Sequence, residues 1–256
     1  MNKILVLFAS EGDREAYEPI VKALKKAKAS FDFKMYSAHK TPDAIEKAIK
    51  SSYSVIIAGA GLAAALPGVV AAKTLKPVIG VPCKGAYEGL DALLSIAQMP
   101  PGIPVLSTGV GKGQVAAESA LKMLKGFEAV TIIGDKDEKA VSKALELLRK
   151  FEVKHKFSSE PDENSVNIVF TRFDEPVEKK DELVIYCPII SPEDDKAEAA
   201  LNLLKHSSHG LWVGLNNGIN AAIAAIEILN VNNAFEGKLI GYRKQMAEKF
   251  KGLNRT

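Results

Sequence analysis

The sequence SAHKTP at residues 37–42, read together with IIAGAG at residues 56–61, decides the fold. A short strand-like run with apolar residues at Phe31, Phe33, Met35 and Tyr36 precedes the first stretch. It is followed by small polar residues, an imidazole, a cation and a proline. This order is typical of a strand that carries reactive groups at its carboxyl end before a helix begins, with Thr41 as the cap and Pro42 in the first turn. In the second stretch, a strand runs into small residues that let the backbone approach a ligand closely.

Strands and helices alternate outward from these two loops. Apolar runs of strand length lie at residues 4–8, 31–36, 55–58, 77–81 and 104–106. Amphipathic or alanine-rich helical segments follow them. This alternation predicts an α/β fold in which helices cover both faces of a parallel sheet, a three-layer arrangement of the flavodoxin or Rossmann type. Ligands bind such sheets beyond the carboxyl ends of the strands, where the polar and glycine-rich loops are expected to meet.

The pattern of the first half returns in the second half. A leucine lies fifteen residues after a glycine in both halves, at Gly109 and Leu124 and again at Gly214 and Leu229. We therefore predict a tandem duplication, with residues 1–126 as a catalytic domain and residues 127–256 as a degenerate repeat.

The second copy has lost the groups that would do chemistry. It carries SSEPDE at residues 158–163 in place of SAHKTP, and the charged stretch Thr171–Asp181 replaces the glycine-rich loop and its helix. A last helix, Lys238–Phe250, has no counterpart after the first copy.

Composition limits the classes of function. The 256 residues are 47% hydrophobic and 25% charged, which is ordinary for a globular protein in water. The net charge of +3, with no basic cluster interleaved with aromatic residues, argues against nucleic acid as a partner. No run is long enough for a membrane helix or a signal peptide, and Cys83 and Cys187 form no metal-binding spacing. We therefore expect a cytoplasmic protein without a membrane partner, a disulfide or a metal site.

These motifs resemble the PurE-type aminoimidazole ribonucleotide carboxylases and mutases of purine biosynthesis. The resemblance covers Ile4–Leu124 and rests on four stretches, Ser37–Pro42, Ile56–Gly68, Lys76–Pro82 and Leu93–Pro104. Members of that family usually carry one copy, ending in a helix that crosses to a neighbouring subunit of an octamer. The resemblance therefore implies a fused pair of copies, one active and one degenerate, with a swapped C-terminal helix and a homo-oligomer of four chains in place of eight subunits.

The resemblance also implies roles for single residues. His39 is the general acid/base, since an imidazole can give and take a proton near neutral pH. Ser10 and Lys40 hold the phosphate of a small-molecule ribonucleotide, and Asp13 accepts hydrogen bonds from the ribose hydroxyls. The other expected binding residues surround the aminoimidazole and its carboxylate, or wall a pocket for carbon dioxide: Ser37, Gly59, Ala60, Gly61 and Leu66. That chemistry requires no metal and no cofactor.

Three positions depart from the usual bacterial mutase pattern. Gly12 stands where a phosphate-binding serine is expected, which leaves only its backbone N–H to donate. Lys40 replaces an arginine, so a bidentate fork becomes a point charge, and Ala65 replaces a histidine. The last two changes favour the animal-type class, which carboxylates aminoimidazole ribonucleotide directly with carbon dioxide. The Ala-Gly-Ala-Gly and Gln-Met-Pro stretches favour the mutase. We predict an N5-carboxyaminoimidazole ribonucleotide mutase, with the direct carboxylase as the alternative.

Two further hypotheses stay open. The eroded second copy is compatible with a catalytically idle nucleotide-binding or regulatory protein, although His39, Ser10 and Asp13 are present in the first copy. A carboxylase of the same fold that acts on a nicotinate nucleotide is disfavoured, because that group lacks the stretch found here at residues 37–42.

Overall fold

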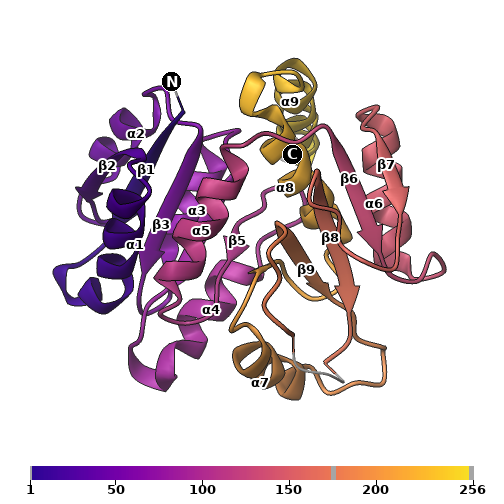
Figure 1. Cartoon of the computed structure of the whole chain (residues 1–256), viewed down its shortest axis with the longest axis horizontal. Helices are drawn as coiled ribbons and strands as arrows, with labels where there is room; N and C mark the ends of the chain where they lie inside the picture. The colour runs from indigo at the N-terminus through magenta and orange to yellow at the C-terminus, as the bar shows by residue number, and fades with distance from the viewer. Residues whose placement is uncertain (1, 174–176, 254–256) are drawn as a thin grey trace.

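The computed structural model describes residues 2–173 and 177–253. Within them, ten strands form one sheet in the order β2-β1-β3-β4-β5-β10-β9-β8-β6-β7. The α/β class is confirmed, and helices cover both faces of a mostly parallel sheet (Figure 1). None of the described helices is both long and apolar enough to cross a membrane.

The first half contains five strands and five helices. Its strands are β1 (Lys3–Phe8), β2 (Ser30–Met35), β3 (Val55–Ala60), β4 (Val78–Pro82) and β5 (Leu106–Ser107). Its helices are α1 (Arg14–Lys26), α2 (Pro42–Ile49), α3 (Ala65–Ala72), α4 (Leu90–Ala97) and α5 (Gly113–Met123).

The second half contains five strands and, in its described part, four helices. Its strands are β6 (Ala129–Ile133), β7 (His155–Phe157), β8 (Ser165–Thr171), β9 (Val184–Pro188) and β10 (Leu211–Trp212). Its helices are α6 (Lys139–Lys150), α7 (Lys196–His206), α8 (Gly218–Leu229) and α9 (Glu236–Leu253).

The two halves meet at an antiparallel seam. β5 pairs with β10 at Ser107 and Trp212, whereas the pairings on either side of the seam are parallel. The strand order of the second half mirrors that of the first, since β6 lies between β7 and β8 as β1 lies between β2 and β3. One sheet therefore runs through both halves. The tandem duplication stays a prediction, which this mirrored order supports.

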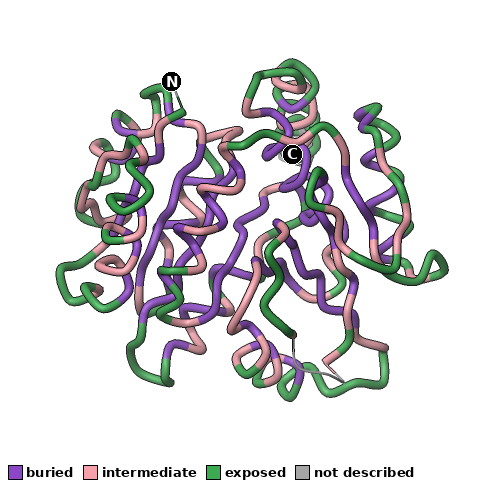
Figure 2. The backbone as a smooth tube through the Cα atoms, in the orientation of Figure 1, coloured by how far each residue is buried: buried purple, intermediate pink, exposed green. Residues whose placement is uncertain are grey.

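The central strands carry the core of the first half. All residues of β3 and β4 are buried, and Figure 2 shows the strands as buried and the outer helix faces as exposed. Val6 and Phe8 pack on the side of α1 and α5, and Leu5 and Leu7 pack on the side of α2, α3 and α4. The loops that leave the strand ends are therefore held by a rigid sheet.

A glycine at the start of one helix in each half lets two helices come close. A Cβ at Gly113 of α5 would lie 2.0 Å from the Ala16 carbonyl oxygen of α1. A Cβ at Gly218 of α8 would lie 1.9 Å from the Ala140 carbonyl oxygen of α6. Both glycines lie four residues after the glycines that the sequence comparison aligned, so the two halves share a packing device as well as a strand order.

The second half lacks two helices that cover the first half. The chain passes from β7 to β8 through residues 158–164, which form no counterpart of α2. The described residues between β8 and β9 form no counterpart of α3. Of the charged stretch Thr171–Asp181 that the sequence analysis singled out, residues 174–176 lie outside the described residues.

The last helix, α9, reaches across to the first half of its own chain. Lys238 pairs with Glu152 of the second half over 2.7 Å. Further along α9, Met246 lies beside Gly102 of the first half, close enough that a Cβ there would clash with its sulfur. The family resemblance implies that this helix crosses to a neighbouring subunit. Within one chain, the helix crosses between the two halves (Figure 1).

Candidate active site

The loops that follow β1, β2, β3 and β4 meet at one edge of the sheet, because parallel strands end on the same side. They enclose a pocket of about 650 Å³. Of the residues that the sequence analysis assigned to the site, all but Gly59 line this pocket: Ser10, Gly12, Asp13, Ser37, His39, Lys40, Ala60, Gly61 and Leu66. Four separate loops thus contribute to one site.

Gly59 lies inside β3 and not in the pocket lining. It is buried, and a Cβ at this position would come within 2.1 Å of the Phe8 ring. The absent side chain makes room for Phe8, whose ring centroid lies 5.4 Å from that of Tyr17. In this structure Gly59 therefore serves packing and makes no wall of the pocket.

The loop between β2 and α2 is closed by its own hydroxyl groups. The Ser37 N–H donates to Thr41 Oγ1 over 2.9 Å, and the Thr41 hydroxyl donates to the Ser37 carbonyl over 3.1 Å. The Lys40 N–H donates to Ser37 Oγ over 3.3 Å. Thr41 stands at the N-cap position but makes no capping bond, so the expected cap was wrong: its hydroxyl fixes the loop before the helix. The closed loop leaves His39 and Lys40 exposed at the pocket.

Ser10 and Gly12 form the turn after β1. The Gly12 N–H donates to Ser10 Oγ over 3.1 Å and thereby caps the short 3-10 helix Glu11–Asp13. The N–H that the sequence analysis left for phosphate is therefore already engaged. The Ser10 hydroxyl can still donate its own proton to an anion while it accepts from Gly12.

Asp13 is a half-buried carboxylate at the centre of the site. Its Oδ2 is buried and has no hydrogen-bond partner among the described residues. Burial raises the pKa of Asp13, and contacts with the Cys83 thiol and the Ser10 backbone oppose that rise only in part. A buried acceptor without a donor is unfavourable, so this geometry suits a ligand that brings hydroxyl groups, such as a sugar.

Replacing Asp13 by asparagine is expected to stabilise the protein at neutral pH. Because its folded-state pKa is raised, the stability that Asp13 contributes is complete below its ordinary value of 3.8 and is lost as the pH rises through the folded-state value. Thermal melts at pH 7 should show a melting temperature at most ~2–4 °C above that of the wild type, which is the rise that ~1 kcal/mol produces in a domain of this size. At about pH 3 the melting temperature should be nearly unchanged. Glu11→Gln, which neutralises an exposed neighbouring carboxylate, is the control. An equal gain in that variant would contradict the explanation.

The pocket also contains residues that the sequence analysis did not assign to it. Lys84 and Gly85 follow β4, and Leu62 continues the loop after β3. The sequence could have indicated Lys84, because it follows β4, which ends at the same edge of the sheet as β2, and Lys40 follows β2 in the same way. The sequence did not indicate Leu62, which is exposed and has a φ of +51°, a backbone conformation uncommon for leucine.

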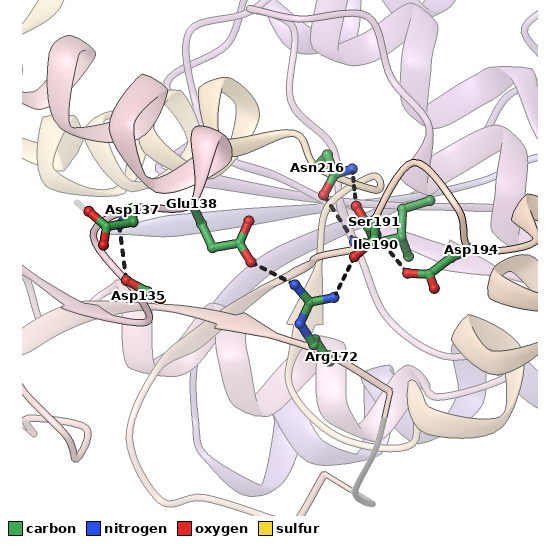
Figure 3. A network of polar contacts seen from close by, with 8 residues as sticks. All are labelled: Asp135, Asp137, Glu138, Arg172, Ile190, Ser191, Asp194 and Asn216. Carbon is green, nitrogen blue, oxygen red and sulfur yellow. Dashed lines mark hydrogen bonds and ion pairs between the residues drawn. The ribbon is translucent and has the colours of Figure 1, made fainter.

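The corresponding edge of the second half is tied together by its own polar side chains (Figure 3). Arg172, which follows β8, pairs with Glu138 over 2.7 Å and donates to Ser191 Oγ over 3.1 Å. The Ser191 N–H in turn donates to Asp194 over 2.6 Å. Groups that follow β6, β8 and β9 thus bind one another. A hollow of about 580 Å³ also lies at this edge, and Ser159, Glu160 and Thr171 are among the residues that line it.

The chain is similar to known proteins over its first half. The profile of the family described as AIR (aminoimidazole ribonucleotide) carboxylase matches residues 3–131, which is 129 of the 256 residues. The match runs from β1 into β6 and includes every loop of the pocket.

Named relatives cover the same region. The N5-carboxyaminoimidazole ribonucleotide mutase of Methanocaldococcus jannaschii is 50% identical over 100 residues, 39% of this chain and 64% of that protein. The phosphoribosylaminoimidazole carboxylase of Candida glabrata is 45% identical over 102 residues, 38% of this chain and 18% of that protein. The chain thus spans less than two thirds of either relative.

The similarity to solved structures is weaker than the similarity in sequence. A crystal structure of Treponema denticola PurE is 24% identical and covers 46% of this chain and 78% of that chain, with a TM-score of 0.41. This likeness is too slight to bear on the assignment, which depends on the sequence profile. Because that profile matches half of the chain and every loop of the pocket, the chain belongs to the AIR carboxylase family.

Proposed function

We propose that the chain is an N5-carboxyaminoimidazole ribonucleotide mutase of de novo purine biosynthesis, acting in the cytoplasm. The observation that carries the proposal is one pocket in which an imidazole, a cation and a carboxylate with an unpartnered oxygen come together: His39, Lys40 and Asp13. Relatives of that name match this region at 45–50% identity, which supports the assignment. The two cysteines are free and buried, which fits a reducing compartment.

The pocket offers a contact for each part of the substrate. The Ser10 hydroxyl and the Lys40 ammonium group bind the phosphate, and Asp13 accepts from the ribose hydroxyls. Ser37 and the small residues after β3 lie against the aminoimidazole and its carboxylate. Leu66, which is 1% exposed, walls the space in which carbon dioxide is held.

In the proposed reaction the carboxyl group moves from the exocyclic nitrogen to the neighbouring ring carbon. The N–C bond breaks as His39 gives a proton to that nitrogen, and carbon dioxide is released beside Leu66. The ring carbon then bonds to the carbon dioxide, and His39 takes the proton that the ring carbon loses. The proton is returned to the histidine, so atoms and charge balance without a co-reactant. This chemistry requires neither a metal nor a cofactor.

The direct carboxylase is the alternative, because Lys40 and Ala65 match the class that uses free carbon dioxide. Turnover of two substrates in parallel tests the choice. One is N5-carboxyaminoimidazole ribonucleotide without added bicarbonate, and the other is aminoimidazole ribonucleotide with excess dissolved carbon dioxide. Preference for the first supports the mutase, and preference for the second supports the carboxylase. Binding without turnover of either would favour an idle regulatory protein.

We also propose that residues 1–126 form the catalytic unit and residues 127–256 a degenerate repeat that binds no ribonucleotide. The network of Arg172, Glu138 and Ser191 supports this proposal, because these groups bind one another. Residues 158–163, which follow β7 as His39 and Lys40 follow β2, also contain neither a histidine nor a lysine. Calorimetric titration with the reaction product is expected to saturate at one molecule per chain. Saturation at two would contradict the proposal.

A homo-oligomer of four chains, in place of eight subunits, is part of the same proposal. A hollow of about 690 Å³ runs along α9, lined mainly by apolar side chains of this helix and of the loop before β5. Ile240 and Phe250 are 53% and 69% exposed there. Apolar surface of this kind is typical of contacts between proteins, which supports association through α9.

A further inference from the structure

Two lysines that line the pocket follow strands on either side of the strand that leads to Asp13. Lys40 lies beyond β2 and Lys84 lies beyond β4, and both line the pocket. In the order β2-β1-β3-β4 the two strands are three spacings apart, which is about 14 Å at ~4.8 Å per spacing. Asp13 follows β1 and lies between them. The two lysines therefore enter the pocket from loops on either side of the one that carries Asp13, an acceptor for hydroxyl groups.

The backbone of Lys84 is fixed against the loop after β3. The Cys83 N–H donates to the Ala60 carbonyl over 3.0 Å. A Cβ at Gly61 would lie 3.6 Å from the Lys84 carbonyl oxygen, and a Cβ at Gly85 would lie 3.7 Å from a backbone nitrogen of the same loop. The backbone at Lys84 therefore lies beside the loop that supplies Gly61.

The ammonium group of Lys84 is free to meet a ligand. Lys84 is exposed, and with the described residues it makes no ion pair and no side-chain hydrogen bond. Lys3, the first residue of β1, lies at the amino end of its strand and forms an ion pair with Asp32 over 2.8 Å. A lysine that only serves solubility can lie anywhere on the surface. An unpaired ammonium group in the wall of a pocket is a strong hydrogen-bond donor to an anion.

The charges of the pocket match a ligand with two anionic groups. The titratable side chains that line it are Asp13, His39, Lys40 and Lys84. Asp13, when ionised, offsets one of the two lysines, and the second lysine adds a further positive charge to the pocket. A ribonucleotide carries its phosphate and its base on opposite sides of the ribose. With the phosphate at Lys40, a carboxylate on the base would face Lys84.

We propose that Lys84 is a specificity-determining residue that binds the carboxylate carried by the base of the substrate. The inference rests on the proposed function, because the carboxylate reaches Lys84 only when the phosphate lies at Lys40. Lys84 thereby favours the carboxylated ribonucleotide over the uncarboxylated one, which is the preference that separates a mutase from a direct carboxylase. Its role is binding, and the proton transfer belongs to His39.

Two variants, Lys84→Ala and Lys84→Arg, test this role against the control Lys25→Ala, which removes an exposed lysine of α1 outside the pocket. In Lys84→Ala the KM for N5-carboxyaminoimidazole ribonucleotide is expected to rise about tenfold, with kcat changed by less than about twofold. Lys84→Arg keeps the charge and should keep most of the affinity. The Kd for aminoimidazole ribonucleotide, which has no carboxylate, should stay within about twofold of the wild-type value in every variant.

The outcomes separate this inference from the proposed function. An unchanged KM in Lys84→Ala would overturn the role of Lys84. An equal loss of affinity for the uncarboxylated ribonucleotide would also overturn it, since it would indicate a contact with the phosphate or the ribose. Failure of the proposed function gives a different result, which appears in the wild-type chain before any variant is compared: it would then prefer aminoimidazole ribonucleotide with carbon dioxide, or turn over neither substrate.

Discussion

Replacing His39 by asparagine is expected to lower kcat by about 10²–10⁴-fold and to leave the affinity for the product nearly unchanged. Asparagine is polar and of similar reach, but it cannot take up and release a proton near neutral pH. His39 is exposed at the pocket wall and makes no side-chain hydrogen bond with the described residues, so its removal leaves no buried group without a partner. The fold should therefore survive, and the loss should fall on the chemical step.

Steady-state turnover and a titration with the product measure these two effects separately. Lys40→Ala is the comparison, since the loss of a phosphate contact should raise KM more than it lowers kcat. His209→Asn, in the second half and outside this pocket, controls for the loss of an imidazole as such. Unimpaired turnover in His39→Asn would contradict the assignment of His39 as the general acid/base. A rise in KM with little change in kcat would reduce His39 to a binding residue.

β1, β3 and β4 could be predicted from the sequence because their apolar runs are unbroken, and β2 because its apolar residues alternate with Asp32 and Lys34. The same criterion missed β8, which has Asn167 in its interior. Asn167 is fully buried, but its amide donates to the carbonyls of Ser165 and Leu183 over 3.1 Å each. Asn167 interrupts the hydrophobic pattern, and the sequence does not show that backbone carbonyls satisfy its amide inside the sheet.

The site could be predicted as a set of loops but not residue by residue. Gly59 and Gly61 are alike in sequence, and only the end of β3 at Ala60 distinguishes a glycine inside the sheet from one at the pocket. The seam between the halves was also out of reach, since β5 and β10 are two residues long each. Two residues are too few for a periodicity to show, although this seam decides that both halves share one sheet.

A large effect on stability is expected from the ion pair between α8 and α9. Glu227 is 2% exposed, and its Oε1 lies 3.0 Å from Arg243 Nη2. Burial raises the pKa of Glu227 to about 8, although the guanidinium group of Arg243 opposes the rise. Because the folded-state pKa is raised, the stability that Glu227 contributes is complete below its ordinary value of 4.5 and is lost as the pH rises through about 8.

Arg243→Ala should therefore destabilise the protein by an amount that grows with pH. At about pH 5 Glu227 is neutral with or without its partner, so the variant loses a hydrogen bond and some packing, about 1–2 kcal/mol. Above about pH 8 the wild type holds an ionised pair, whereas the variant must bury a lone carboxylate or keep it protonated. Breaking a buried pair in this way costs about 3–5 kcal/mol.

Urea unfolding at about pH 5 and pH 9 measures this difference. Lys244→Ala removes an exposed cation from the same helix and should change the free energy of unfolding by less than ~0.5 kcal/mol at both values. Replacing both partners, with Glu227→Leu and Arg243→Met together, should restore much of the stability because neither charge then has to be desolvated. A loss in Arg243→Ala that does not depend on pH would mean that the guanidinium group acts through packing alone. The same loss in the double variant would mean that the ion pair is not what secures α9 to α8.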